Sequence, residues 1–300
     1  MKLSVFLELI EAKAKAASIF PFLIGLCFSW YHFKQINGFL IFLFFIAMIL
    51  FNFAVDTLNN YSDYTNIHAT DDYKKMTNII GRENIPLPFI RSLLRFFLTS
   101  SFLVGLFLSW HVGWDVFFLG LLSFSIGIFY SWGPRPLNSL PVGEVASGLS
   151  MGFLIPLIVV RINLHPYFIW KTNTVLSIFI LSLPLVLWIA NVMLANNTCD
   201  LEEDLLNNRH TLVSYIGQKR AVQLFGLNHL IAYGAIIISV LLKIAPWTYA
   251  LTLLTIPFVL KQHRIFQKQQ VKTKTFICSV RILIVTSLAQ VIGFGIGLLF

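Results

Sequence analysis

The chain has 300 residues, of which 57% are hydrophobic and 12% are charged, and its mean hydropathy is +0.78. Soluble domains carry roughly 25% charged residues, so this composition excludes a water-soluble globule of the same length. The net charge of +9 indicates no nucleic-acid partner, because basic loops that face an anionic membrane leaflet account for it.

Apolar residues gather into runs long enough to cross a bilayer, which takes about 20 residues of helix. Residues 39–51 do not alternate between apolar and polar types, as the strands of a membrane barrel would. We therefore predict an all-α integral membrane protein with about nine transmembrane helices. The predicted spans are residues 15–33, 36–58, 89–111, 114–132, 143–163, 174–196, 220–242, 246–261 and 277–299.

Residues 2–14 have an amphipathic pattern. Apolar side chains recur there at helical spacing, at Leu3, Phe6, Leu7 and Ile10. This pattern predicts either a helix on the membrane surface or an extension of the first span. Charged residues interrupt the segment, so it does not resemble a cleavable signal peptide.

The basic residues predict how the chain is oriented. With nine spans and a cytoplasmic N-terminus, 22 Lys and Arg residues divide very unevenly, and only Lys34, Arg161, Lys171 and Lys243 fall outside. Basic residues concentrate in cytoplasmic loops, so this orientation is favoured and the C-terminus is predicted to lie outside.

Two long loops, near residues 59–88 and 197–219, follow the second and sixth predicted spans. Each of these two spans is followed by a similar five-residue motif, called a word below: Asn59-Asn60-Tyr61-Ser62-Asp63 and Asn196-Asn197-Thr198-Cys199-Asp200. An Asn-Asn-x-x-Asp word at the same place in two helical segments suggests an internal repeat. Both words are predicted to lie on the cytoplasmic side.

Each word continues as a polar stripe, because residues three or four apart share a helix face. The first stripe contains Asp56, Asn59 or Asn60, and Asp63, and the second contains Asn196, Asp200 and Asp204. Such side chains are costly in a bilayer and are usually functional there. Paired carboxylates suit Mg²⁺ bound together with substrate phosphates, so the two stripes facing a common cavity are candidates for binding a diphosphate. Basic residues near the two words are candidates for direct contact with the diphosphate: Lys74, Lys75, Arg82 and Arg209.

With these residues identified, the chain resembles the UbiA superfamily of membrane prenyltransferases. The resemblance implies a single domain over residues 1–300, with nine helices around a central cavity and Asp-rich motifs after helices two and six. The first motif departs from the family pattern, because Asn60 stands where Asp is usual and the next acidic residues are Asp71 and Asp72. Asp56, one helical turn earlier, is a candidate for the missing carboxylate.

The finer resemblance is to the menaquinone branch, the dihydroxynaphthoate prenyltransferases. That branch has an Asn-Asn-x-x-Asp-x-x-x-Asp motif followed by a basic residue and Thr-Leu, which is matched by residues 196–204 and by Arg209, Thr211 and Leu212. It also has a Tyr-x-x-Gly-Pro-x-Pro-Leu segment leading to Gly-Glu, which is matched by residues 130–137 and 143–144.

The resemblance implies transfer of a polyprenyl group from its diphosphate to an aromatic acceptor, which in this branch is dihydroxynaphthoate, and a role in menaquinone biosynthesis. It implies Mg²⁺ as cofactor, with Asp63, Asp200, Asp204 and Asp56 as candidate metal ligands. The first three of these carboxylates and Tyr130 are the candidate catalytic residues; Tyr130 and Trp132 are candidates for lining an electron-rich pocket. The candidate substrate-binding residues are Asn59, Asn60, Lys74, Arg82, Arg135, Glu144, Asn196, Asn197 and Arg209.

Two alternatives stay open at this point, and a third is excluded. A prenyltransferase of the same superfamily with another acceptor, such as 4-hydroxybenzoate, haem or a sugar phosphate, would carry similar motifs. A secondary transporter would also have repeats and intramembrane polar residues, although its site would lie near the bilayer midplane rather than beside basic loops. A purely structural membrane scaffold would have no use for two matched acidic stripes.

Overall fold

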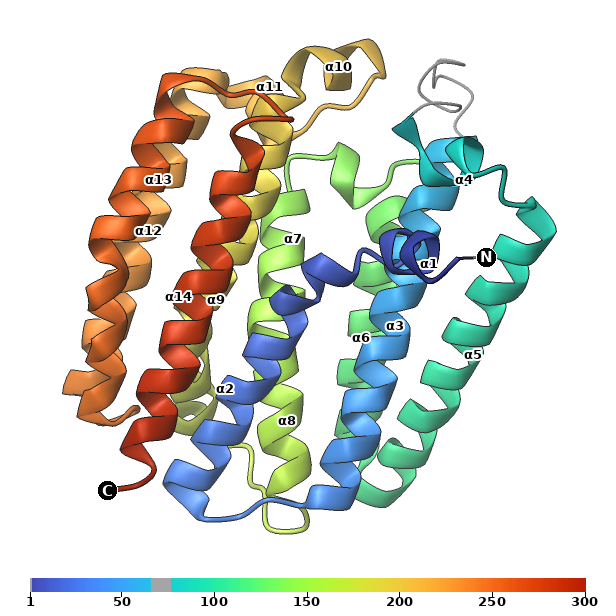
Figure 1. Ribbon diagram of the computed structural model, residues 1–300. Coiled ribbons are helices and arrows are strands. Elements are labelled where there is room, and N and C mark those ends of the chain that lie inside the picture. The colour runs from blue at the N-terminus through green and yellow to red at the C-terminus, as the bar shows by residue number, and fades with distance from the viewer. Residues whose placement is uncertain (1, 66–76) are drawn as a thin grey trace. The chain divides into compact units, whose positions relative to one another are not determined.

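The computed structural model describes residues 2–65 and 77–300, and every regular element in these ranges is helical (Figure 1). Within them, eight helical segments are long and apolar enough to cross a membrane. They are α2 (Ala16–Phe33), α3 (Gly38–Thr65), α5 (Leu87–Val112), α6 (Trp114–Ser131), the run of α7, η4 and α8 (Gly143–Asn163), α9 (Thr172–Cys199), α12 (Gln218–Leu241) and α14 (Phe276–Gly297). The chain is therefore a multi-pass membrane protein.

The remaining predicted span, residues 246–261, is a helix of two parts. Its first part is the 3₁₀-helix η5 (Trp247–Thr255), and its second is α13 (Ile256–Lys268). Pro257 stands at the start of α13, where a missing backbone N–H is tolerated, so the helix type changes at that point. The later part of α13 is polar, with Lys261, Gln262 and Arg264, so neither part alone is a long apolar helix.

The chain divides into two compact units. Unit 1 comprises Met1–Lys15 and Phe39–Leu137, and unit 2 comprises Ala16–Gly38 and Asn138–Phe300. The remaining elements of unit 1 are α1 (Leu3–Leu9), η1 (Ala12–Lys15) and α4 (Ile79–Arg82). The run Gly143–Asn163 consists of α7 (Gly143–Leu149), η4 (Ser150–Leu154) and α8 (Ile155–Asn163), and the other short elements in the later part of the chain are η3 (Leu137–Ser139), α10 (Leu201–Leu206) and α11 (Leu212–Ile216).

In unit 1, the N-terminal segment is packed into the apolar core rather than merely attached to it. Leu9 is buried in a cluster with Ile79, Ile80, Ile90 and Leu94. The next residue, Ile10, packs against α3 and α5 in a second cluster with Ala54 and Phe97. The opposite side of α1 is exposed, so the segment is amphipathic as its spacing predicts, and it brings the chain to Lys15 beside α3.

In unit 2, α9 is the central helix and packs against α7, α12 and α14 (Figure 1). Two glycines let α7 and η4 approach α9 closely. A Cβ atom on Gly148 would lie 2.6 Å from the carbonyl oxygen of Val186, and a Cβ on Gly152 would lie 2.6 Å from the Val186 nitrogen. Glu144, Gly148 and Gly152 are four residues apart and share one face, so the close approach also directs Glu144 at α9.

Candidate active site

The second acidic motif lies where α9 ends. Asp200 leaves the helical conformation of α9, with φ −99° and ψ 11°, and the next residue begins the short helix α10. Backbone hydrogen bonds continue across this corner, since the Asp200 N–H donates to the Asn196 carbonyl at 3.0 Å and the Asp204 N–H donates to the Asp200 carbonyl at 2.8 Å. The motif residues are therefore fixed by the backbone.

Asp204 is a buried carboxylate with one unsatisfied oxygen. Its residue is 4% exposed, and the Arg209 Nε lies 3.4 Å from its Oδ1. Its Oδ2 is buried and has no hydrogen-bond partner in the described part of the chain. Burial raises the pKa of Asp204 to about 6, against the opposing effect of Arg209. A desolvated carboxylate with a spare oxygen is suited to binding a further cation.

Asn197, within the same motif, is bound to Glu144 of α7. The Asn197 Nδ2 donates to the Glu144 Oε1 at 2.8 Å, and both residues are buried. The Asn197 Oδ1 has no hydrogen-bond partner among the described residues. Glu144, predicted as a substrate-binding residue, holds the Asn197 amide through this bond, and its contact with a substrate stays a prediction.

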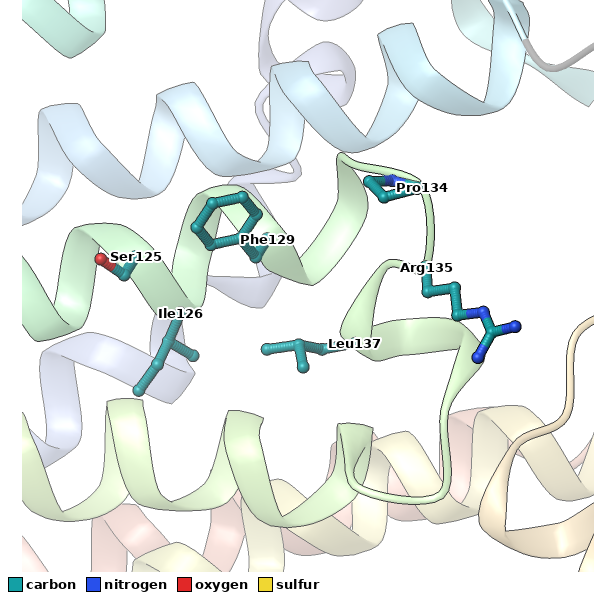
Figure 2. A pocket seen from close by; sticks show the side chains of 6 residues that line it. All are labelled: Ser125, Ile126, Phe129, Pro134, Arg135 and Leu137. Atoms are coloured by element: carbon teal, nitrogen blue, oxygen red, sulfur yellow. The ribbon is translucent and has the colours of Figure 1, made fainter.

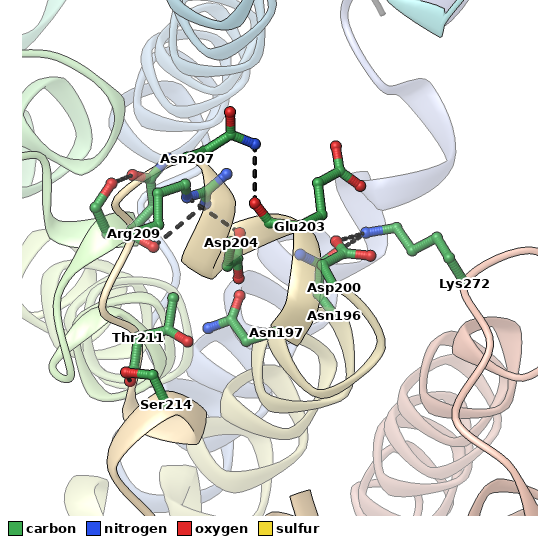
Figure 3. A network of polar contacts seen from close by, with 12 residues as sticks. Asn196, Asn197, Asp200, Glu203, Asp204, Asn207, Arg209, Thr211, Ser214 and Lys272 are labelled. Carbon is green, nitrogen blue, oxygen red and sulfur yellow. Dashed lines mark hydrogen bonds and ion pairs between the residues drawn. The ribbon is translucent and has the colours of Figure 1, made fainter. Parts of the chain in front are cut away.

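Asp200 and Asn196 are bound to a lysine from another part of unit 2. The Lys272 ammonium forms an ion pair with the Asp200 Oδ2 and a hydrogen bond with the Asn196 Oδ1 (Figure 3). Lys272 lies between α13 and α14, more than 70 residues from the motif. No spacing in the sequence connects Lys272 to Asp200, so the sequence does not predict their contact.

Arg209 also connects the motif to the segment that follows α6. Its guanidinium Nη2 donates to the Asn138 carbonyl at 3.3 Å, and the N–H of His210 donates to the Ser139 carbonyl at 3.0 Å. Arg209 thus contacts both Asp204 and the residues just after the Gly-Pro-x-Pro-Leu word. Contact between Arg209 and a substrate stays a prediction.

The first motif, in unit 1, is also held by hydrogen bonds. The Asn59 Oδ1 accepts from the Ser131 hydroxyl at 2.9 Å. The Asn60 Nδ2 donates to the Leu9 carbonyl at 3.3 Å and to the Asp56 carbonyl at 3.1 Å. A carboxylate has no proton to donate, so an ionised Asp at position 60 could not make these bonds. The departure from the family pattern at Asn60 therefore has a structural reason: its amide attaches the N-terminal segment to α3.

Asp56 is paired with Lys15. The two side chains form an ion pair, and their exposed fractions are 20% and 10%. Burial lowers the pKa of Lys15 to about 8. The Lys15 ammonium also lies 5.6 Å from the centre of the Phe53 ring. Asp56, predicted as a metal ligand, thus forms an ion pair with a lysine that lies outside the motif. Asp63 lies half-buried near the end of α3.

Of the basic residues of unit 1 that were predicted to bind diphosphate, Lys74, Lys75 and Arg82, the structure describes only Arg82. Arg82 ends α4, and its guanidinium donates to Glu8 at 2.7 Å and to Glu83 at 3.4 Å. These interactions raise the pKa of Arg82, chiefly through the hydrogen bond with Glu8. Lys74, together with Lys75, Asp71 and Asp72, lies outside the described residues.

A cavity of about 660 Å³ lies in unit 1 at the end of α6 (Figure 2). Figure 2 shows Ser125, Ile126 and Phe129 on α6, and the other three lining residues, Pro134, Arg135 and Leu137, on the segment that follows. Its lining is mostly apolar, with one guanidinium. Tyr130 is half-buried on the same helix, and Trp132, just beyond it, is 55% exposed.

The donor atoms of the second motif fit a hard divalent cation. Carboxylate and amide oxygens are the ligands that Mg²⁺ prefers, and Asp204 Oδ2 and Asn197 Oδ1 are buried oxygens without partners in the described residues. Within residues 2–65 and 77–300, no three His, Cys, Asp or Glu residues gather into a metal-binding group. The second motif alone therefore supplies an incomplete set of protein ligands, which suits Mg²⁺, since this ion usually keeps waters and binds substrate phosphates.

Comparison with protein families decides the class of the molecule. The model of the UbiA prenyltransferase family matches residues 18–284. This chain belongs to that family. It is a UbiA-type prenyltransferase, as the two Asn-Asn-x-x-Asp words predict.

Individual relatives agree with this family. A 1,4-dihydroxy-2-naphthoate octaprenyltransferase of Bacillus subtilis (strain 168) is 27% identical over 248 residues, which cover 82% of this chain and 77% of the relative. A UbiA homologue from Aeropyrum pernix K1, solved in its apo form, superposes with a TM-score of 0.70 at 18% identity, covering 94% of this chain and 98% of that one. A UbiA homologue from Archaeoglobus fulgidus, bound to GPP and Mg²⁺, has a TM-score of 0.65 at 14% identity, covering 97% and 99%. These structures show that the chain has the UbiA fold.

Proposed function

We propose that this prenyltransferase moves a polyprenyl group from its diphosphate to 1,4-dihydroxy-2-naphthoate, giving a demethylmenaquinone in menaquinone biosynthesis. The observation that carries the proposal is the buried, partly unsatisfied Asp204 inside an Asn-Asn-x-x-Asp-x-x-x-Asp word. The Bacillus subtilis relative is named for the same acceptor, which supports naphthoate over 4-hydroxybenzoate.

Asp200 and Asp204 are the proposed Mg²⁺ ligands, with the Asn197 oxygen beside them, and the Archaeoglobus fulgidus homologue was solved with Mg²⁺ and a prenyl diphosphate. When bound, the ion would neutralise the negative charge that develops on the leaving diphosphate. Arg209 holds Asp204 in place and presents further N–H donors for phosphate oxygens. Asp63 is proposed as an additional metal ligand on the strength of the first motif.

Other residues of the chain are proposed to bind the isoprenoid chain and the aromatic acceptor. The apolar walls of the cavity beside Phe129 suit an isoprenoid chain, and the Arg135 guanidinium suits an anionic group, either diphosphate or the acceptor carboxylate. Tyr130 presents a π-face of the kind that stabilises an allylic cation as the C–O bond breaks. Basic-residue counting supports a cell-membrane location with the N-terminus and the active site on the cytoplasmic side.

The test uses membranes that contain the full chain, a labelled prenyl diphosphate and Mg²⁺. We expect a lipid-soluble naphthoquinol product from dihydroxynaphthoate, with release of CO₂, and loss of product on chelation. Asp204→Asn keeps the volume of the side chain and should lower the rate roughly 10²–10³-fold, the loss typical of one preorganised charge-stabilising group.

Glu202→Gln is the matched control, because Glu202 is an exposed carboxylate on the same short helix. It should keep the wild-type rate. Full activity in Asp204→Asn would refute the role of the second motif. Prenylation of 4-hydroxybenzoate without any naphthoate product would overturn the acceptor and leave the prenyltransferase class in place.

A further inference from the structure

Lys272 belongs to neither acidic motif, yet it lies on a well-built turn. The Thr275 hydroxyl accepts from the Val271 N–H at 2.9 Å, and the N–H groups of Lys274 and Thr275 donate to the Val271 carbonyl at 3.0 and 2.8 Å. Thr275 is 1% exposed, so this turn is anchored in unit 2. Lys272 is the second residue of the turn and is therefore held near the end of α9 by backbone geometry rather than by its own side chain alone.

The Lys272 ammonium makes three close contacts with described residues. It forms the ion pair with the Asp200 Oδ2 and the hydrogen bond with the Asn196 Oδ1 (Figure 3). It also lies 5.1 Å from the centre of the Phe276 ring, one helical turn further along. Two oxygen ligands and an aromatic face thus surround one positive charge. Asp200 is one of the two carboxylates that the second motif would offer to a metal ion.

We propose that Lys272 is a built-in counter-ion of the second motif, which neutralises Asp200 when no metal is bound and so sets the affinity for the metal. The inference rests on the proposed function, because it assumes that Asp200 is a metal ligand. The Asp200 Oδ2 cannot serve the ammonium and a divalent ion at full strength together, since both are cations at the same oxygen. Metal binding must therefore compete with the Lys272 ion pair, and Lys272 is a positioning residue rather than a catalytic one.

This competition predicts the direction in which metal affinity changes when the Lys272 ammonium is removed. Lys272 is 44% exposed, so its ion pair is of the partly solvated kind and its release into water is inexpensive. Removal of the ammonium should raise metal affinity roughly three- to tenfold, which is the value expected for one such pair with its hydrogen bond. A residue that merely organised the loop would have the opposite effect, because its loss would disorder Asp200 and weaken binding.

The experiment measures Mn²⁺ alone binding to the full chain in phosphatidylcholine nanodiscs, by the electron paramagnetic resonance signal of free Mn²⁺. Lys272→Met should bind Mn²⁺ roughly three- to tenfold tighter than wild type. Lys272→Arg keeps the charge and should stay near the wild-type affinity. Lys274→Met is the matched control, since it removes an exposed positive charge from the same turn. Its affinity should also stay near wild type, because salt screens charges that make no direct contact.

The outcomes separate the inference from the function on which it rests. Equal or weaker Mn²⁺ binding by Lys272→Met, beside normal binding by wild type, would overturn the counter-ion role alone. A wild-type chain that binds no Mn²⁺ would overturn the metal site as well. Should Lys272→Met fail to fold, Lys272→Gln provides the same loss of charge with a polar side chain and must show the same tightening.

Discussion

Gly148→Ala tests whether the close contact between α7 and α9 maintains the second motif. The added Cβ would lie 2.6 Å from the Val186 carbonyl oxygen and 3.3 Å from the Ala190 Cβ. Ordinary contacts between carbon and a carbonyl oxygen are about 3.3–3.6 Å, so the backbones must separate by about 0.7 Å or more. A backbone oxygen cannot rotate away as a flexible side chain can, and the two helices themselves must move.

Overpacking of this kind costs about 1–3 kcal/mol, which corresponds to a fall of about 2–12 °C in Tm for a unit of this size. The separation also displaces Glu144, one turn earlier on the same face of α7, and loosens its hydrogen bond to Asn197. Prenyl transfer should therefore fall by more than the loss of folded protein explains.

Thermal unfolding of the purified chain in nanodiscs, followed by tryptophan fluorescence, measures the first effect, and initial rates at 20 °C below the Tm measure the second. Gly234→Ala is the matched control, because Gly234 lies inside α12 of the same unit and a Cβ there meets nothing within 4 Å. Alanine is the better helix former, so Gly234→Ala should unfold at the same temperature or higher. Equal behaviour of the two variants would refute the reasoning.

Two further predictions concern unit 1. Lys15→Met leaves the Asp56 carboxylate without its ion-pair partner and should cost about 3–5 kcal/mol of stability in chemical unfolding; adding Asp56→Leu should recover most of this loss, and a double variant as unstable as the single one would contradict the pairing. Arg82→Gln removes only exposed ion pairs with Glu8 and Glu83, so the free energy of unfolding should change by less than about 1 kcal/mol. A raised KM for the prenyl diphosphate in that variant would support contact with the substrate, whereas unchanged kinetics would remove Arg82 from the site.

Much of the fold could be predicted because the bilayer restricts the possible lengths of apolar helices. The ends of α3 and α9 were harder to place. Both continue beyond the predicted spans, to Thr65 and Cys199, because the polar motif residues extend the helices instead of ending them. Apolar composition cannot reveal such an extension, since the added turns are the polar ones.

The candidate site was predictable only in part, for a related reason. Asp200 and Asp204 stand out because their spacing is local and repeats a word found elsewhere in the chain. Their partners do not stand out: Lys272 reaches Asp200 from 72 residues away. Lys15 likewise forms an ion pair with Asp56, although the whole of α2 lies between them in the sequence. Pairs between distant segments leave no periodicity in the sequence, so only the folded arrangement identifies them.

The division of the chain into two units has a consequence for the way the protein is made. The polypeptide passes from unit 1 to unit 2 after Lys15, returns before Phe39, and leaves again after Leu137. Within unit 2, α2 packs against α8 and α14, so a helix that is synthesised early has as a neighbour one that is synthesised much later. α2 must therefore remain in the lipid, without α14 beside it, until Phe276–Gly297 has been synthesised. The apolar surface of α2 is compatible with contact with lipid during this interval. A chain whose synthesis stops before Phe276 would lack α14, so unit 2 would be incomplete.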